Sequence, residues 1–412
     1  MDKLRTLFDS ELGYVVLLFA LFVVPRVLLR WRIPTAITSF GLGAAAAVGF
    51  GLFDHNETLH LLASFGIVAL FLFAGLEVDL LALRRHAVIL GQHLAIRVGL
   101  IGLVAFIATQ AFALDPRPGI LFALAILIPS TGFILDSLPS FGLDPEEQFW
   151  VKGKAIATEI LALVLLFVVL QSTSVSRFGL ATLALGSLIA ILPPIFRLFA
   201  VRIAPWAPKS EFAFLLMMAV VVAYATRALG VYYLVGAFVV GIAARRFREA
   251  LPAMASERML HAVEVFASFF APFYFFVAGT RMRAEDFTPA ALLYGVGLAA
   301  IVLPLRMGAV MLHRRAALGE TARRSIRVAV PMLPTLVFTL VLAGILRDQF
   351  ALPSTLFGAL IVYTLLNTIL PGLVLGTPVP TYDAPELPPA GGDPSDLLAR
   401  PMSSPFDPPR TG

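Results

Sequence analysis

The chain has 412 residues, of which 59% are hydrophobic and only 14% are charged. With a mean hydropathy of +0.90, this composition excludes an ordinary soluble domain and predicts an integral membrane protein. The formal charge of +5 does not indicate nucleic-acid binding, because the basic residues fall in short connections between apolar runs, where they orient helices. The absence of cysteine excludes disulfides, thiolate nucleophiles and cysteine-ligated metal centres, and we expect no cofactor.

Apolar windows of about 20 residues predict an all-α polytopic membrane protein with about 13 transmembrane helices. The predicted segments are 13–30, 34–53, 58–80, 87–113, 118–138, 150–171, 178–200, 210–228, 230–245, 259–280, 289–312, 326–346 and 353–376. The first segment lacks a convincing cleavage site before Pro25, so we expect it to remain as a spanning helix.

The distribution of lysine and arginine predicts how these segments are oriented. Most of the basic residues, including Lys152 and Lys154, are assigned to loops that follow odd-numbered segments. By the positive-inside rule, these loops are cytoplasmic, the N-terminus is outside and the C-terminus is inside. The loops that follow even-numbered segments carry only Arg117, Arg177, Arg227, Arg281, Arg283 and Arg347.

The segment 118–138 contains Pro129, followed by Ser130 and Thr131. Proline removes a backbone donor and clashes with the preceding helical turn, so this helix is expected to kink or unwind inside the membrane. Freed carbonyl groups and the two hydroxyls then become oxygen ligands for an ion. An ordinary kinked helix is the alternative interpretation.

The next stretch, Val151 to Gln171, is apolar enough to span a membrane but carries Glu159 about halfway along, preceded by Thr158. A carboxylate near the bilayer midplane is costly, and it normally faces a partner or a wet cavity. Glu159 is therefore the first candidate for a functional site.

An internal repeat relates the first half of the chain to the second half. Phe71–Gly75 reads FLFAG and Phe275–Gly279 reads FFVAG, and seven segments separate the two copies. Because this offset is odd, the copies have opposite orientations in the membrane. The same offset pairs Arg97 with Arg306, and the Pro129 interruption with a second one at Pro331 and Pro334. We expect inverted halves at about 13–171 and 210–376, joined by a linker helix at 178–200.

The composition changes abruptly after the last apolar segment. Residues 377–412 are rich in proline, with scattered glycine, serine and aspartate. Such a segment cannot bury enough apolar surface to fold. We expect a disordered, proline-rich cytoplasmic tail, while residues 1–376 form the transmembrane domain.

Several of these stretches resemble a known family. Four stretches occur in the order typical of monovalent cation:proton antiporters: LFLFAGLEVDL at 70–80, ILIPSTGFILDSL at 126–138, the Glu159 helix and FFAPFYFFVAGTRM at 269–282. A fifth, LPLRMG at 303–308, resembles the helix where relatives place a buried Lys or Arg. The resemblance is to the sodium/hydrogen exchanger superfamily, in the branch that contains potassium efflux antiporters. It implies two crossed, discontinuous helices, a homodimer and a bacterial cytoplasmic membrane.

The chain departs from the resembled pattern at one position. Relatives usually carry an aspartate on this helix, preceded by Asn, Asp or Gln, whereas the matching residues here are Thr158 and Glu159. A glutamate can also bind either a proton or a cation, although its longer side chain shifts the site.

These observations predict a secondary transporter, not an enzyme, that exchanges Na⁺ or K⁺ for protons by alternating access. Glu159 is expected to bind the proton or the cation, with Thr158, Ser130 and Thr131 as oxygen donors. Arg306 would compensate the charge of empty Glu159. Arg97, Asn367, Pro129, Pro331 and Pro334 are possible accessory residues.

Three alternatives remain open from the sequence. Glu159 and Arg306 form a purely structural pair in the first. In the second, the chain is a proton-coupled carrier of an organic anion, and in the third it is a membrane sensor without transport. The lone His93 is expected to be hydrogen-bonded within the packed helices.

Overall fold

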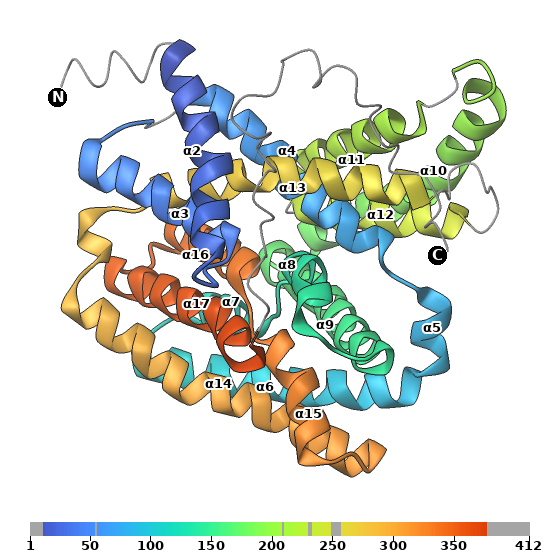
Figure 1. Cartoon of the computed structure of the whole chain (residues 1–412). Helices are drawn as coiled ribbons and strands as arrows, with labels where there is room; N and C mark the ends of the chain where they lie inside the picture. Colours follow the sequence, from blue (N-terminus) through green and yellow to red (C-terminus); the bar gives the residue numbers. More distant parts are fainter. Residues whose placement is uncertain (1–10, 54–55, 208–209, 230–232, 249–256, 377–412) are drawn as a thin grey trace, which may run out of the picture. The chain divides into compact units, whose positions relative to one another are not determined.

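The computed structural model describes residues 11–53, 56–207, 210–229, 233–248 and 257–376, and this part of the chain is helical throughout, without strands (Figure 1). The predicted proline-rich tail at 377–412 lies outside the described residues.

The helices of the first half follow the predicted segments closely. They are α2 (Glu11–Leu29), α3 (Thr35–Ala44) with the π-helical turn η1 (Ala45–Gly49), α4 (Glu57–Leu76), α5 (Leu80–Arg85), α6 (Ala87–Phe112), α7 (Pro116–Leu127), α8 (Thr131–Ser137) with the 3₁₀ turn η2 (Leu138–Phe141), and α9 (Pro145–Gln171). The segment predicted as a linker is helical and forms α10 (Val175–Leu198), extended by η3 (Phe199–Ile203); its role as a linker stays a prediction.

The second half repeats this order. Its helices are α11 (Glu211–Ala228), α12 (Tyr233–Arg248), α13 (Glu257–Thr280), the turn η5 (Ala284–Asp286), α14 (Pro289–Leu318), α15 (Ala322–Ala329), the turn η6 (Val330–Met332), α16 (Leu336–Phe350) and α17 (Ser354–Leu375).

Ten helices in the described part of the chain are long and apolar enough to cross a membrane, and there are up to eleven if the bent pair Ala322–Met332 and Leu336–Phe350 is one span. The predicted all-α membrane fold is confirmed. The predicted number of thirteen is not, because the segments 34–53 and 230–245 form apolar helices only at Thr35–Gly49 and Leu234–Arg245, which are shorter than a full span.

The repeated glycines hold α4 and α13 against neighbouring helices at very short range. A methyl group added at Gly75 of α4 would lie 2.3 Å from the carbonyl oxygen of Phe238 in α12, and one added at Gly279 of α13 would lie 2.1 Å from that of Phe40 in α3. Small residues permit such approaches between membrane helices. Because α3 and α12 are related by the same seven-segment offset, the packing is reciprocal, as an inverted repeat requires. Figure 1 shows α13 beside α3 and α4.

We predict that Gly75→Ala and Gly279→Ala each lower the stability of the detergent-solubilised protein by about 2 kcal/mol, because the added methyl group forces the helices apart. Thermal unfolding measures the effect. Gly99→Ala in α6 is the matched control, since no atom lies within 4 Å of its added methyl group; it should leave the melting temperature unchanged or slightly raised. A Gly75→Ala protein as stable as the wild type would contradict the predicted close packing.

Candidate functional site

Two spans are interrupted inside the membrane region. The first break, Ile128–Ser130, separates α7 from α8, and the second, Leu333–Thr335, separates η6 from α16, where the two parts of the span are bent by 45°. Each break has proline in its middle and a hydroxyl residue at its end. Pro129 therefore corresponds to Pro334, whereas Pro331 lies in the turn η6 that precedes the second break.

The two breaks contact each other directly. The backbone N–H of Ser130 donates to the carbonyl oxygen of Pro334 at 2.8 Å. The Ser130 hydroxyl oxygen accepts from the backbone N–H of Val337 at 2.9 Å and, more weakly, from that of Phe338 at 3.4 Å. Backbone groups freed by one break are thus satisfied by the other, as a water-free environment demands. This crossing confirms the two crossed, discontinuous helices of the predicted fold.

The carbonyl groups at the end of α7 are satisfied by side chains from the second half. Thr339 of α16 donates its hydroxyl to the carbonyl oxygen of Ala125 at 2.7 Å. The Tyr363 hydroxyl donates to that of Ile126 at 2.6 Å. The crossing is therefore built by four helices, α7, α8, α16 and α17.

Arg306 of α14 satisfies the carbonyl groups at the second break. Its two terminal nitrogens donate to the carbonyl oxygens of Met332 and Leu333, both at 2.8 Å, and one of them also donates to the Tyr363 hydroxyl at 3.0 Å. A guanidinium suits this position because it carries several donors and also complements the negative end of a helix dipole. Within the described residues no ion pair joins Arg306 to Glu159, so the purely structural pair does not form here. Charge compensation at longer range stays a prediction.

Arg97, which the repeat pairs with Arg306, has a different environment. It is buried in α6, and its Nη1 atom has no hydrogen-bond partner among the described residues. By symmetry Arg97 would satisfy the carbonyl groups of Leu127 and Ile128, which correspond to those of Met332 and Leu333, but no hydrogen bond joins Arg97 to either of them in the described structure. The two halves therefore differ in the hydrogen bonds of their arginine: Arg306 bonds carbonyl groups at a break, and Arg97 does not.

Glu159 lies on α9, only 2% exposed, beside the start of α8. Its Oε2 atom and the Thr131 hydroxyl oxygen both lack a hydrogen-bond partner in the described structure. The two groups are close enough to interact electrostatically, but not in hydrogen-bond geometry. A buried acceptor without a donor is costly, and such an arrangement leaves room for a proton or a cation to bind.

Asn367 of α17 is the counterpart of Glu159 in the second half, and its polar atoms are fully used. Its Oδ1 atom accepts the backbone N–H of Thr335 at 3.1 Å, and its Nδ2 atom donates to the Thr335 hydroxyl oxygen at 2.8 Å. Asn367 thus stabilises the start of α16, whereas Glu159 remains unpaired at the start of α8.

Thr158 points to a different set of neighbours. Its hydroxyl donates to the carbonyl oxygen of Lys154 at 2.7 Å, so the hydroxyl oxygen accepts from His93 Nε2 at 3.1 Å. His93 is buried and hydrogen-bonded, as predicted. Of the four predicted ligands, the structure brings Glu159 and Thr131 together, while the hydroxyls of Ser130 and Thr158 are engaged elsewhere.

Lys154 was not predicted to be near the site. Its assignment to a loop is wrong, because α9 begins at Pro145 and Lys154 is fully buried. Its ammonium group lies 3.0 Å from His313 Nδ1 of α14. The sequence indicates that Lys154 is near the site only by its position, one helical turn before Thr158. Thr335, also missed, is indicated by Leu333–Thr335 repeating the pattern of Ile128–Ser130.

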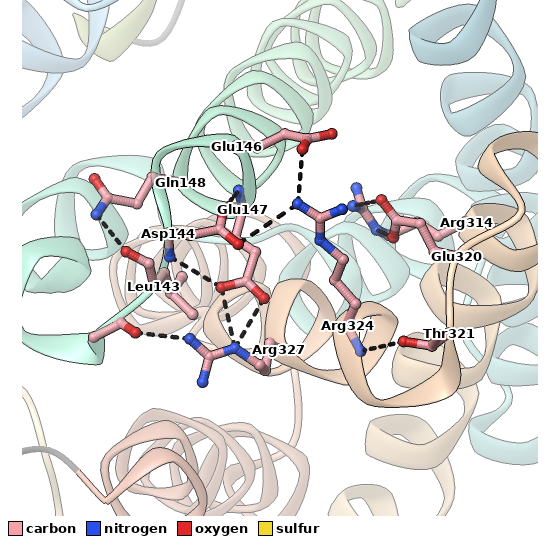
Figure 2. A network of polar contacts seen from close by, with 11 residues as sticks. Leu143, Asp144, Glu146, Glu147, Gln148, Arg314, Glu320, Thr321, Arg324 and Arg327 are labelled. Atoms are coloured by element: carbon pink, nitrogen blue, oxygen red, sulfur yellow. Dashed lines mark hydrogen bonds and ion pairs between the residues drawn. The ribbon is translucent and has the colours of Figure 1, made fainter.

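A cluster of ion pairs fixes the start of α9 against α15 (Figure 2). Arg327 donates to the Glu147 carboxylate at 2.8 and 3.0 Å, and Arg324 donates to Glu146 at 2.7 Å. Asp144 caps α9 and lies 3.5 Å from Arg324. The pKa of Asp144 lies below its usual range, chiefly because its carboxylate accepts a hydrogen bond from the backbone N–H of Glu147. This cluster ties the helix that carries Glu159 to the second broken span.

Comparison with known proteins now adds to this geometry. Residues 15–380 match the family described as "Sodium/hydrogen exchanger, transmembrane". The chain belongs to this family. It is therefore an antiporter-type membrane transporter, as the sequence motifs predicted. Placement in the branch of potassium efflux antiporters stays a prediction.

Two relatives from Methanocaldococcus jannaschii illustrate the similarity. The "Probable Na(+)/H(+) antiporter 3" is 27% identical over 288 residues, which cover 65% of this chain and 70% of the relative. The solved structure of the sodium proton antiporter MjNhaP1 at pH 8 superimposes with a TM-score of 0.66 and 16% identity, covering 89% of this chain and 98% of the other. An electron-microscopy structure of MjNhaP1 gives 0.61 and 16% identity, with 88% and 94% covered. These structures support the fold.

We predict that Arg306→Leu lowers the stability of the protein by about 2 kcal/mol, because it leaves the carbonyl groups of Met332 and Leu333 without donors. Thermal unfolding in detergent measures this loss. Arg306→Lys is the matched control, and it should lose less because an ammonium group can still reach one carbonyl. Equal stability of Arg306→Leu and wild type would contradict the assigned role.

Proposed function

We propose that this protein exchanges a monovalent cation for protons across the cell membrane by alternating access, with the Glu159 carboxylate as the shared site. The observation that carries this proposal is the unpaired carboxylate itself. Glu159 is buried beside the crossing of two broken helices, and one of its oxygens has no donor among the described residues.

The chemistry follows from the cost of a buried charge. A carboxylate inside the membrane region is stabilised by either a proton or a cation, and one site cannot hold both at once. Competition between the two couples their movements in opposite directions. The Thr131 hydroxyl is the best-placed additional oxygen ligand, because it faces Glu159 and lacks a partner. Ser130 and Thr158 support the site by fixing α8 and α9.

A cavity of about 1030 Å³ supports access from one side of the membrane. Its lining includes the buried residues Val68 of α4 and Leu340 and Val341 of α16. These α16 residues follow Val337 and Phe338, whose N–H groups contact Ser130 at the crossing. We propose that transport moves the crossing helices together with α9 and α15, which Arg327 and Glu147 join to each other, relative to the glycine-packed helices α3, α4, α12 and α13.

The comparisons favour sodium as the cation, since the relatives carry the names Na⁺/H⁺ antiporter and sodium proton antiporter. Potassium remains the second candidate. An organic-anion carrier is less well supported, because the terminal nitrogens of Arg306 are bonded to carbonyl groups and are not free to hold an anion. The homodimer, the external N-terminus and the cytoplasmic C-terminus are part of the same proposal.

The test uses everted vesicles that contain the full chain and a pH-sensitive dye. Adding Na⁺ or K⁺ to vesicles acidified by respiration should make the wild-type protein carry protons out of the vesicle interior, and Glu159→Gln should reduce this signal to that of empty vesicles, because an amide cannot exchange a proton. Glu159→Asp should retain measurable exchange. Glu57→Gln, an exposed glutamate at the start of α4, is the matched control and should behave as the wild type.

Three results would overturn the proposal. Exchange that persists in Glu159→Gln would show that another group carries the proton. A wild-type protein that responds to organic anions but not to Na⁺ or K⁺ would show the carrier instead, and a protein at normal abundance that responds to neither would favour the sensor.

A further inference from the structure

The cavity described above is lined mainly by positively charged side chains, which is unexpected for the path of a cation. Its lining contains five arginines and a single acidic residue, Asp348. The arginines are Arg177, Arg227, Arg281, Arg283 and Arg347. These are five of the six basic residues that the sequence places in the loops after even-numbered segments, so nearly all the positive charge predicted on that side of the membrane converges on one cavity.

Three of the arginines are neutralised by acidic neighbours. Arg281 lies 3.5 Å from Asp348, and Arg283 lies 3.3 Å from Glu285. Arg347 is paired with Asp286. These ion pairs explain the presence of the three arginines without any bound ligand.

Arg177 and Arg227 have no such explanation. Both side chains are exposed, and within the described residues no acidic group or carbonyl accepts a hydrogen bond from either guanidinium. Arg177 stands in the first turn of α10, where the N–H groups already make the local field positive and a cation is disfavoured. Arg227 lies in the last turn of α11. Two unpaired arginines therefore line one concave surface.

Concave surfaces of one charge concentrate ions of the opposite sign. A guanidinium presents a planar fork of donors that matches the oxygens of a phosphate group. We propose that Arg177 and Arg227 form a binding site for a phosphate group at this cavity, supplied either by free inorganic phosphate or by an anionic phospholipid headgroup. The bound anion cancels the excess positive charge on the path that the cation takes. Glu159 does not line this cavity, so phosphate binding can be tested apart from exchange, whereas its effect on the path of the cation rests on the proposed function.

The test measures thermal stabilisation of the purified full chain in detergent at constant ionic strength. Inorganic phosphate, phosphatidylglycerol micelles and sodium chloride are titrated separately. A saturable rise in melting temperature with phosphate alone identifies free phosphate, and a rise only with phosphatidylglycerol identifies the lipid. No saturable rise beyond that of chloride with either probe overturns the proposal.

Variants connect the binding to these two residues. Arg177→Gln and Arg227→Gln should each raise the ligand concentration at half-maximal stabilisation by about tenfold, because each removes a charge-assisted hydrogen bond to phosphate. Both side chains are exposed and unpaired, so the single variants should fold. Arg323→Gln, an exposed arginine of α15 outside the cavity, should bind as the wild type. Glu159→Gln should also bind normally, which separates this site from exchange. Unchanged midpoints in both arginine variants would overturn the assignment.

Discussion

The structure depends on one constraint, which is that every backbone group freed inside a membrane must find a partner within the protein. Two prolines, Pro129 and Pro334, lie in the breaks of two spans. The breaks are stable because they lie against each other, with Ser130 donating to Pro334 and accepting from the start of α16. Arg306 bonds the carbonyl groups that remain. The crossing is thus held by hydrogen bonds and not by a pair of opposite charges.

Beside this crossing, Glu159 Oε2 and the Thr131 hydroxyl lack a hydrogen-bond partner in the described structure. The two halves of the repeat have helices in the same order, but their side chains at corresponding positions form different hydrogen bonds. Both polar atoms of the Asn367 side chain form hydrogen bonds with Thr335, whereas one oxygen of the Glu159 carboxylate has no donor in the described structure. A neutral amide can serve as a permanent structural partner, while a carboxylate requires a positive charge or a proton. The inequality of the halves therefore supports the proposal of a single exchangeable site at Glu159.

Much of this arrangement is predictable from the sequence, because it depends on local chemistry. Gly75 and Gly279 indicate close helix packing, and the prolines at 129 and 334 indicate broken spans. Proline alone does not break every span, because Pro304 and Pro371 lie inside continuous helices. The partners of long side chains are not predictable in this way. Arg306 was expected to face Glu159 but bonds backbone carbonyls, since the choice between two nearby acceptors depends on a few ångströms of tertiary geometry. Lys154 was placed in a loop because the charged start of α9 does not resemble a membrane helix, although the ion pairs with α15 extend the helix to Pro145.

The central claim is that one carboxylate holds either a proton or the cation. Isothermal titration calorimetry with NaCl, in two buffers of equal pH and different ionisation enthalpy, tests it most directly. Competition at Glu159 predicts that sodium binding releases a proton, so the apparent enthalpy should differ between the buffers in the wild type and lose this difference in Glu159→Gln. The measurement is made at a pH where infrared spectroscopy shows that Glu159 is protonated. Sodium binding with the same enthalpy in both buffers would then contradict the shared site.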